Sequence, residues 1–208
     1  MPKLLIAGLA LAAAGMLIAC RPVVSTAPIG TTVGVNADPR LLGIWVDAQS
    51  GDSSYFANTA DGDGAIRSAM CDEPTAQGCD KYDYFRIHTA RLGAYNYIDA
   101  AGTDAKGRPL AQSEVPGHVP LAYAFDAKGQ LVLYLMASQP ARDAVRAGKI
   151  AGVVTKDRSK IEDVTLTAPA AQLDAFLATS EGHALFTASK PLVLKKQAAL
   201  RSGKAPAN

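Results

Sequence analysis

The sequence has almost no net charge. It contains 21 Lys and Arg residues against 19 Asp and Glu residues, a formal net charge of +2 at pH 7. Proteins that bind nucleic acid usually carry a basic patch with aromatic residues between the charges, and no such cluster appears here. We therefore expect no nucleic-acid partner.

The sequence also lacks the motifs of common enzyme classes. It has no Gly-x-Ser-x-Gly, no His-Glu-x-x-His, no Walker loop and no dinucleotide-binding fingerprint. Its three histidines, His88, His118 and His183, are widely spaced, and a lone histidine is more often structural than catalytic. We expect no enzyme activity, no catalytic residue, no cofactor and no metal site.

The chain has no apolar run long enough to be a good membrane span. Lys3 precedes an apolar run at residues 4–19, 16 residues in length. A spanning helix needs roughly 20. A positively charged start, a short apolar segment and small residues at its end are typical of a signal peptide. We predict a signal peptide at residues 1–19.

The end of this run, Leu17-Ile18-Ala19-Cys20, resembles the lipobox of bacterial prolipoproteins. The resemblance implies that Cys20 is lipidated, with palmitate among its acyl groups, and becomes the N-terminus after cleavage. It also implies a cell-envelope location. Because Arg21 follows, where Asp marks inner-membrane retention in enteric lipoproteins, we expect the outer membrane, with the domain facing the periplasm. The alternative is a cysteine that merely ends a plain signal peptide or an uncleaved helix.

Cys71 and Cys79 are the other two cysteines. The envelope is oxidising, and the seven-residue loop between them contains Pro74 and Gly78, which allow it to turn back. We predict a structural disulfide. A zinc site is the alternative, but zinc needs four ligands, and His88 is the nearest third.

Composition divides the remainder of the chain into three parts. Residues 20–38 are rich in Pro, Ser, Thr, Gly, Val and Ala without a persistent period, so we predict a flexible tether. We expect residues 39–198 to form a single β-rich domain and residues 199–208 to form a disordered tail. No internal repeat is visible.

Short alternating segments separated by turns dominate the domain. We expect strands at 41–46, 53–57, 65–70, 82–88, 94–99, 121–126, 130–137, 164–166 and 191–195, with helices at 139–147 and 169–179. The turn Asp61-Gly62-Asp63-Gly64 fits a hairpin better than a calcium loop, because Ala65 and Ile66 replace the required ligand and glycine. The fold class is mainly β (α+β): an antiparallel meander sheet or small barrel with two short helices towards the C-terminus.

Leu42-Gly43-Ile44-Trp45 carries a second resemblance. It looks like the Gly-x-Trp signature that opens the first strand of lipocalins, and a late helix followed by a final strand is also lipocalin-like in order. The resemblance implies a barrel whose closed end is plugged by Trp45. The segment at 137–164 has no counterpart in that family. More broadly, the chain is similar to the many uncharacterised β-rich bacterial lipoproteins that start with Leu-x-Gly-x-Trp. Alternatively, Trp45 simply fills the core.

Aromatic residues alternate on several predicted strands, so that each pair shares one strand face. Adjacent strands would align these pairs into an aromatic wall, on which a lipid or an aromatic ligand could lie. The candidate ligand-binding residues are Trp45, Tyr84, Tyr97 and Tyr123. The alternative is cross-strand packing without a ligand, in which these residues and Tyr134 line or close the core. The pairs are Tyr82 with Tyr84, Tyr95 with Tyr97, and Tyr123 with Phe125.

These observations favour a lipid-anchored cell-envelope lipoprotein that acts as a non-enzymatic binding or assembly module. Its partners would be the membrane, through the anchor, and a lipid, a small apolar ligand or an envelope protein. Two alternatives remain open. One is an envelope hydrolase with an unrecognised site, and the other is an enzyme-inhibitor lipoprotein that uses the disulfide loop.

Overall fold

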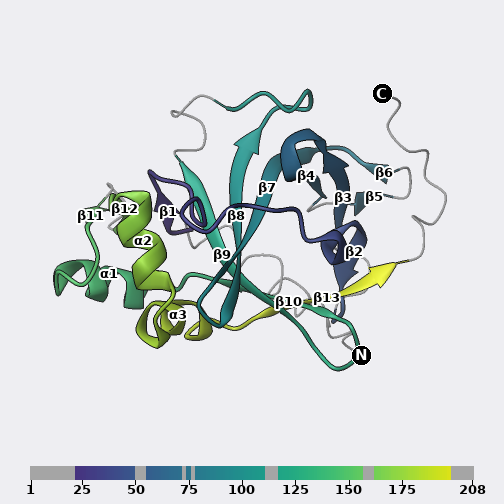
Figure 1. Ribbon diagram of the computed structural model, residues 1–208. Helices are drawn as coiled ribbons and strands as arrows, with labels where there is room; N and C mark the ends of the chain where they lie inside the picture. The colour runs from purple at the N-terminus through teal and green to yellow at the C-terminus, as the bar shows by residue number, and fades with distance from the viewer. Residues whose placement is uncertain are drawn as a thin grey trace, which may run out of the picture.

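An antiparallel β-barrel forms the body of the protein in the computed structural model (Figure 1). The structure describes residues 22–49, 55–71, 74–75, 78–110, 117–156 and 162–197. The predicted signal peptide, the lipidation site Cys20 and the predicted tail at 199–208 therefore lie outside the described residues. The predicted fold class, mainly β with short helices towards the C-terminus, is confirmed, and the sheet is a closed barrel.

Eight strands close the barrel, each antiparallel to its neighbours. Seven follow one another as a meander, and the eighth returns late in the chain to pair with both the seventh and the first. In barrel order they are β2 (Gly43–Asp47), β3 (Tyr55–Asp61), β4 (Ala65–Cys71), β7 (Tyr82–Leu92), β8 (Tyr95–Thr103), β9 (His118–Phe125), β10 (Leu131–Leu135) and β13 (Leu192–Gln197).

The insertion between β10 and β13 covers one side of the barrel. Figure 1 shows its helices together with the β11–β12 hairpin on one side, opposite β2, β3 and β4. The described residues contain three α-helices rather than the predicted two. The insertion comprises α1 (Ser138–Arg146), β11 (Gly152–Lys156), β12 (Glu162–Leu166), α2 (Ala170–Leu177) and α3 (Ser180–Thr187).

The additional helix α3 begins where the Thr179 hydroxyl accepts a hydrogen bond from Gly182 N at 3.0 Å. Gly182 is required because a Cβ atom there would lie 2.2 Å from Phe176 O. A glycine in the first turn lowers helix propensity. For this reason the sequence pattern did not predict α3 or its close packing against α2.

The turns follow local chemistry as predicted. Asp63, with φ of 61°, lies in a 3-10 turn, η3 (Gly62–Gly64), which connects β3 to β4. In the β9–β10 hairpin, Asp126 Oδ1 accepts hydrogen bonds from Lys128 N and Gln130 N, and Gly129 has a φ of 73°. Positive φ at these positions suits Asp and Gly.

The segment before β2 differs from the predicted flexible tether. Its described residues, 22–38, pack against the barrel: Val23 and Ile29 are buried, and β1 (Val24–Ser25) joins β9 and β12. The buried carboxylate of Asp174 on α2 accepts hydrogen bonds from Gly30 N at 2.7 Å, Thr32 N at 3.1 Å and Thr32 Oγ1 at 2.5 Å. Small residues let the backbone of this segment lie close to the barrel and to α2. The composition that predicts a flexible tether therefore serves close packing instead.

Alternation on the barrel strands divides the core into two layers. Inward-facing residues such as Trp45, Ile66, Ile98 and Leu131 form one cluster inside the barrel. Outward-facing residues such as Tyr97 and Ala122 form a second cluster with the helices and the N-terminal segment. The strand β10 contributes to both, which explains its two apolar faces.

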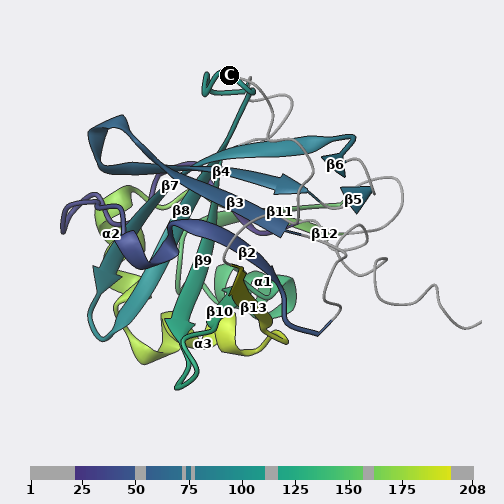
Figure 2. The ribbon, with the colours of Figure 1, turned by 90° about the vertical axis from the view of Figure 1, so that its right-hand side faces the viewer.

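Cys71 and Cys79 form a disulfide, with their Cα atoms 6.1 Å apart, as the sequence predicts. The bond closes the small hairpin of β5 (Pro74–Thr75) and β6 (Gly78–Cys79), which lies at the edge of the barrel in Figure 2. Within the described residues, no helix combines the length and the apolar character that crossing a membrane requires.

Candidate functional site: a groove beside the barrel

Trp45 packs inside the barrel near one end and is only 1 % exposed. Its Nε1–H donates to Leu41 O at 2.8 Å, and Asn58 Nδ2 donates to the same carbonyl at 3.0 Å. Leu41 belongs to the 3-10 helix η2 (Pro39–Leu41), which precedes β2. This burial leaves Trp45 without access to a ligand from solvent.

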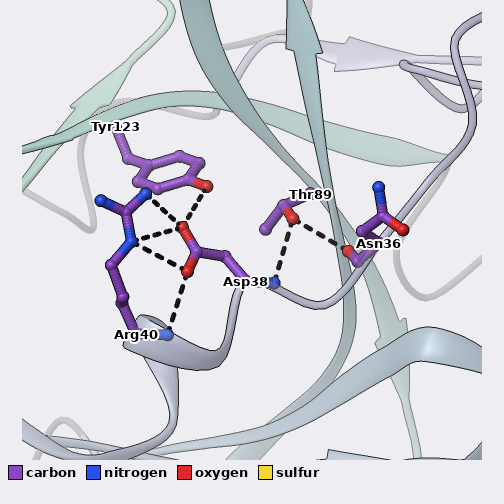
Figure 3. A network of polar contacts seen from close by, with 5 residues as sticks. All are labelled: Asn36, Asp38, Arg40, Thr89 and Tyr123. Atoms are coloured by element: carbon purple, nitrogen blue, oxygen red, sulfur yellow. Dashed lines mark hydrogen bonds and ion pairs between the residues drawn. The ribbon is translucent and has the colours of Figure 1, made fainter.

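A polar network holds the same end closed (Figure 3). Asp38 Oδ2 accepts from Tyr123 Oη at 2.9 Å and from Arg40 Nη2 at 2.7 Å, and Asp38 N donates to Thr89 Oγ1 at 3.2 Å. Burial alone would raise the pKa of Asp38, but the hydrogen bonds from Arg40 and Tyr123 outweigh it and lower that pKa. The Tyr123 hydroxyl is therefore held by Asp38, as part of the polar network at this end of the barrel.

Tyr97 lies on the opposite, outer face of the barrel, beneath the helices. Its hydroxyl donates to Leu177 O at 2.8 Å and lies 3.3 Å from His183 Nδ1, and the His183 ring stacks on Tyr95 with centroids 3.7 Å apart. Burial raises the pKa of the Tyr97 hydroxyl and lowers the pKa of His183. Tyr134 packs against the same cluster. These residues stabilise the helix–barrel interface.

Asp99 and His118 form the one acid–histidine pair among the described ion pairs, with Asp99 buried and His118 partly exposed. His118 Nδ1 lies 2.8 Å from Asp99 Oδ2, and Asp99 Oδ1 accepts from Ile29 N at 3.1 Å. Ser25 stands opposite His118 in the strand register, but its buried hydroxyl donates to Ala27 O and accepts from Ala27 N. The pair thus fixes the N-terminal segment, and Ser25 is not poised as a nucleophile.

A groove of about 1100 Å³ lies at the other end of the barrel, and we call it the rim groove. Its first wall comes from the start of β7, the end of β8 and the start of β9. The apolar floor includes Phe85 and Val119, which also pack against the core inside the barrel. The rings of Tyr82 and Tyr84 on β7, with centroids 6.0 Å apart, add an aromatic edge.

The second wall is built from β1, β11 and β12 and from Pro22, two residues before β1. It contains Pro22 and Val24 with Val164, and the hydroxyl-bearing Thr155 and Thr165. The parallel pairing of Val24 with Thr165 holds this wall together. Concave sites that combine apolar walls with a few polar groups are the usual form of small-ligand sites.

The polar groups of the rim groove are carboxylates and hydroxyls. Asp83, Asp104 and Asp163 line it, and none of the described lining residues is Lys, Arg or His. Asp104 Oδ2 accepts from Arg108 Nε at 2.7 Å, and its hydrogen bonds, first among them that from Arg108 N, lower the pKa of Asp104. Thr103 is only 5 % exposed, and its buried Oγ1 has no hydrogen-bond partner among the described residues.

The disulfide adjoins this groove. Cys71 pairs with Tyr82 in the β4–β7 register, and Cys79 and Tyr82 pack in one small cluster with Val46. The bond therefore braces the strand end that carries the aromatic edge. The sequence predicts the disulfide but not its place beside a groove, because the second wall comes from β1 and β12, which are distant in sequence from β7.

The structure separates the four predicted ligand-binding residues. Trp45 and Tyr123 close one end of the barrel, Tyr97 supports the helices, and only Tyr84 lines the rim groove. The expected aromatic wall does not form, because Tyr84 pairs with Thr103 at one end of the β7–β8 hairpin whereas Tyr97 pairs with Ala90 at the other. Alternation places the aromatic pairs correctly on strand faces, but only the strand register decides their height along the barrel.

Comparison with known proteins gives no family for the chain. No family model matches it. No curated protein matches it, and no solved structure does.

Proposed function

We propose that the protein is a lipid-anchored cell-envelope module that binds a small amphiphilic ligand, without catalysis, in the rim groove. The observation that carries this proposal is the groove itself, with apolar walls from Phe85, Val119 and Val164 and hydroxyl groups from Thr155 and Thr165. Apolar walls hold the body of a ligand, and a few polar groups orient it.

The position of the groove supports an amphiphile as the ligand. Pro22 lines the groove, and Cys20 precedes it by two residues. Two residues span at most about 7 Å. A lipid on Cys20 would therefore hold the groove close to the bilayer surface, where amphiphiles are concentrated.

A blocking variant tests the site. Ala105 lines the groove and is exposed, so Ala105→Trp should fill the groove without disturbing the core. Ala127→Trp, in the exposed β9–β10 turn at the opposite end of β9, is the matched control. The measurement is the fluorescence of N-phenyl-1-naphthylamine, a neutral apolar dye, added to the purified mature chain carrying Cys20→Ala.

We expect the dye to bind the parent chain and Ala127→Trp equally and to bind Ala105→Trp at least several-fold more weakly. Equal binding to both variants would place the dye elsewhere on the protein. Absence of binding to the parent chain would contradict a role in binding small apolar ligands.

A further inference from the structure

We infer that the rim groove receives an acyl chain carried by Cys20 of the same molecule, and that this chain closes the groove to other amphiphiles. The inference rests on the proposed function, because it makes the lipid anchor a regulatory ligand of the proposed site. It starts from one observation: Pro22, which begins the described chain, lines the groove.

The segment that leads from Cys20 to the barrel is held at the groove wall. Val23 is only 2 % exposed, and Val24 pairs with Thr165 in the parallel register of β1 and β12. Two residues, which span at most about 7 Å, separate Pro22 from Cys20. A group attached to Cys20 therefore starts beside the groove.

The backbone of this segment is itself part of the wall. Pro22 and Val24 both line the groove, whereas Val23 between them packs in the core cluster beneath the helices. This alternation is that of an extended chain with one face turned to the groove. An acyl chain that starts here needs no rearrangement of the barrel to enter.

The size and the lining of the groove suit one acyl chain. Its volume of about 1100 Å³ slightly exceeds the roughly 300–1,000 Å³ of sites for drug-sized ligands. Both walls supply apolar side chains along which methylene groups can lie, namely Phe85, Leu110, Val119 and Val164. Burial of methylene groups from water provides the driving force.

The ionisable groups of the lining favour an attached acyl chain over a free fatty acid. None of the described lining residues is Lys, Arg or His, so a fatty-acid carboxylate would find no basic side chain there. An acyl chain in ester or amide linkage has no charge to balance. Attachment through a short linker also gives it a millimolar effective concentration, which a dissolved amphiphile seldom reaches.

Chemical alkylation tests the inference without relying on lipidation in cells. Because Cys71 and Cys79 are bonded to each other, Cys20 is the one free thiol of the mature chain. It is alkylated with N-dodecylmaleimide or, as a polar control, with N-(2-hydroxyethyl)maleimide, and N-phenyl-1-naphthylamine then measures how far the groove is open. We expect the dodecyl adduct to bind the dye about tenfold more weakly than the hydroxyethyl adduct.

A second attachment point provides the matched control. Ala127→Cys, in the chain carrying Cys20→Ala, places the same dodecyl group in the exposed turn beyond β9. The eight residues of β9 extend over about 26 Å, which is beyond the reach of a dodecyl chain. We expect this adduct to bind the dye as the unmodified chain does. The block at Cys20 should persist on dilution, because capture within one molecule does not depend on protein concentration.

The outcomes separate this inference from the proposed function. Equal dye binding by the two Cys20 adducts, with Ala105→Trp still blocking the dye, would overturn the capture of the acyl chain and retain the binding groove. An equal block from both attachment points, or a block that disappears on dilution, would also overturn it. Absence of dye binding to the unmodified chain would overturn the proposed function and this inference with it.

Discussion

Trp45 carries several stabilising contacts at once. Besides the hydrogen bond to Leu41 O, its ring lies 6.0 Å from the Phe125 ring, and Lys196 Nζ lies 5.4 Å from the Trp45 ring centroid. Lys196 is opposite Trp45 in the β2–β13 register, where the barrel closes. One side chain thus connects the first barrel strand, the last strand and the 3-10 helix at the closed end.

We predict that Trp45→Ala lowers the free energy of unfolding by about 3–5 kcal/mol, as for other buried large aromatics. Typical domains have only about 5–15 kcal/mol in total. Because Trp45 is the only tryptophan, a thermal melt should be followed by circular dichroism rather than by tryptophan fluorescence. Val153→Ala, at a side chain that is 49 % exposed, is the control and should change little. A shift of only a degree or two in the Tm of Trp45→Ala would contradict the core assignment.

His118 should make stability depend on pH. The hydrogen bond to Asp99 raises the pKa of His118 above its ordinary value of 6.5 against the opposing effect of burial. The folded state therefore holds this proton more tightly than the unfolded state. The resulting stabilisation is fully present below pH 6.5 and is lost as the pH rises through the raised pKa.

Urea titrations between pH 5 and pH 9 should show this loss in the parent chain, and His118→Gln should flatten it. His183 has the opposite effect on the pH dependence of stability. Its pKa is lowered by burial, so its effect appears as a loss of stability when the pH falls below 6.5. His183→Gln should leave the alkaline loss intact, and if it removed that loss, the assignment to His118 would be wrong.

At the scale of elements, the N-terminal segment behaves as part of the barrel wall. Gly30 and Gly34 both have a φ of +83°, so an alanine at either site meets the same backbone strain. A Cβ atom at Gly30 would lie 2.2 Å from Ala90 Cβ, whereas one at Gly34 would meet nothing within 4 Å. Comparing alanine variants at these two positions therefore separates the cost of backbone strain from the cost of overpacking.

We predict that Gly34→Ala costs about 1–2 kcal/mol of stability, the usual cost of the left-handed conformation. Gly30→Ala should cost a further 1–3 kcal/mol or so, because overpacking adds to that strain. Hydrogen exchange of residues 22–38 should become faster in Gly30→Ala than in Gly34→Ala. Identical stability and exchange in the two variants would indicate a segment that does not pack in solution, as a flexible tether would behave.

The disulfide stabilises the end of the β4–β7 strand pair, where Cys71 lies opposite Tyr82. We predict that the Cys71→Ala/Cys79→Ala double variant loses about 2–3 kcal/mol, because the bond no longer restricts the unfolded chain. Mass spectrometry of protein purified without reductant should find the parent chain two hydrogens lighter than its reduced form. Free thiols at both positions in envelope-derived protein would contradict the bond.

At the scale of the whole molecule, we expect attachment to the membrane to depend on Cys20. We predict that Cys20→Ala abolishes palmitate labelling and releases the domain from membranes, because each buried methylene of an acyl chain contributes about 0.8 kcal/mol. Fractionation with a high-salt wash measures this directly, with the Cys71→Ala/Cys79→Ala double variant as the control for loss of cysteines elsewhere. A parent chain recovered as soluble periplasmic protein would refute the anchor.

Features that depend on neighbours along the chain can be predicted from the sequence alone. Alternation predicted the strands of the β9–β10 hairpin, turn residues predicted the β3–β4 connection, and two cysteines eight positions apart predicted the disulfide. Each follows from local backbone preference or from a short loop, so it needs no knowledge of distant residues.

Contacts between distant segments depend on the folded arrangement of the whole chain. It brought Val24 and Thr165 together as one groove wall, placed Tyr84 rather than Tyr97 in the other, and fixed residues 29–32 on the carboxylates of Asp99 and Asp174. These pairings depend on strand register and on barrel closure. They also depend on how the insertion packs against the N-terminal segment, where Thr26 contacts Leu166, 140 positions away. The sequence carries no local signal for any of these contacts. A segment of small residues has the same sequence pattern whether it stays extended in solvent or lies in close contact with a barrel, because Gly, Ser and Ala permit both conformations.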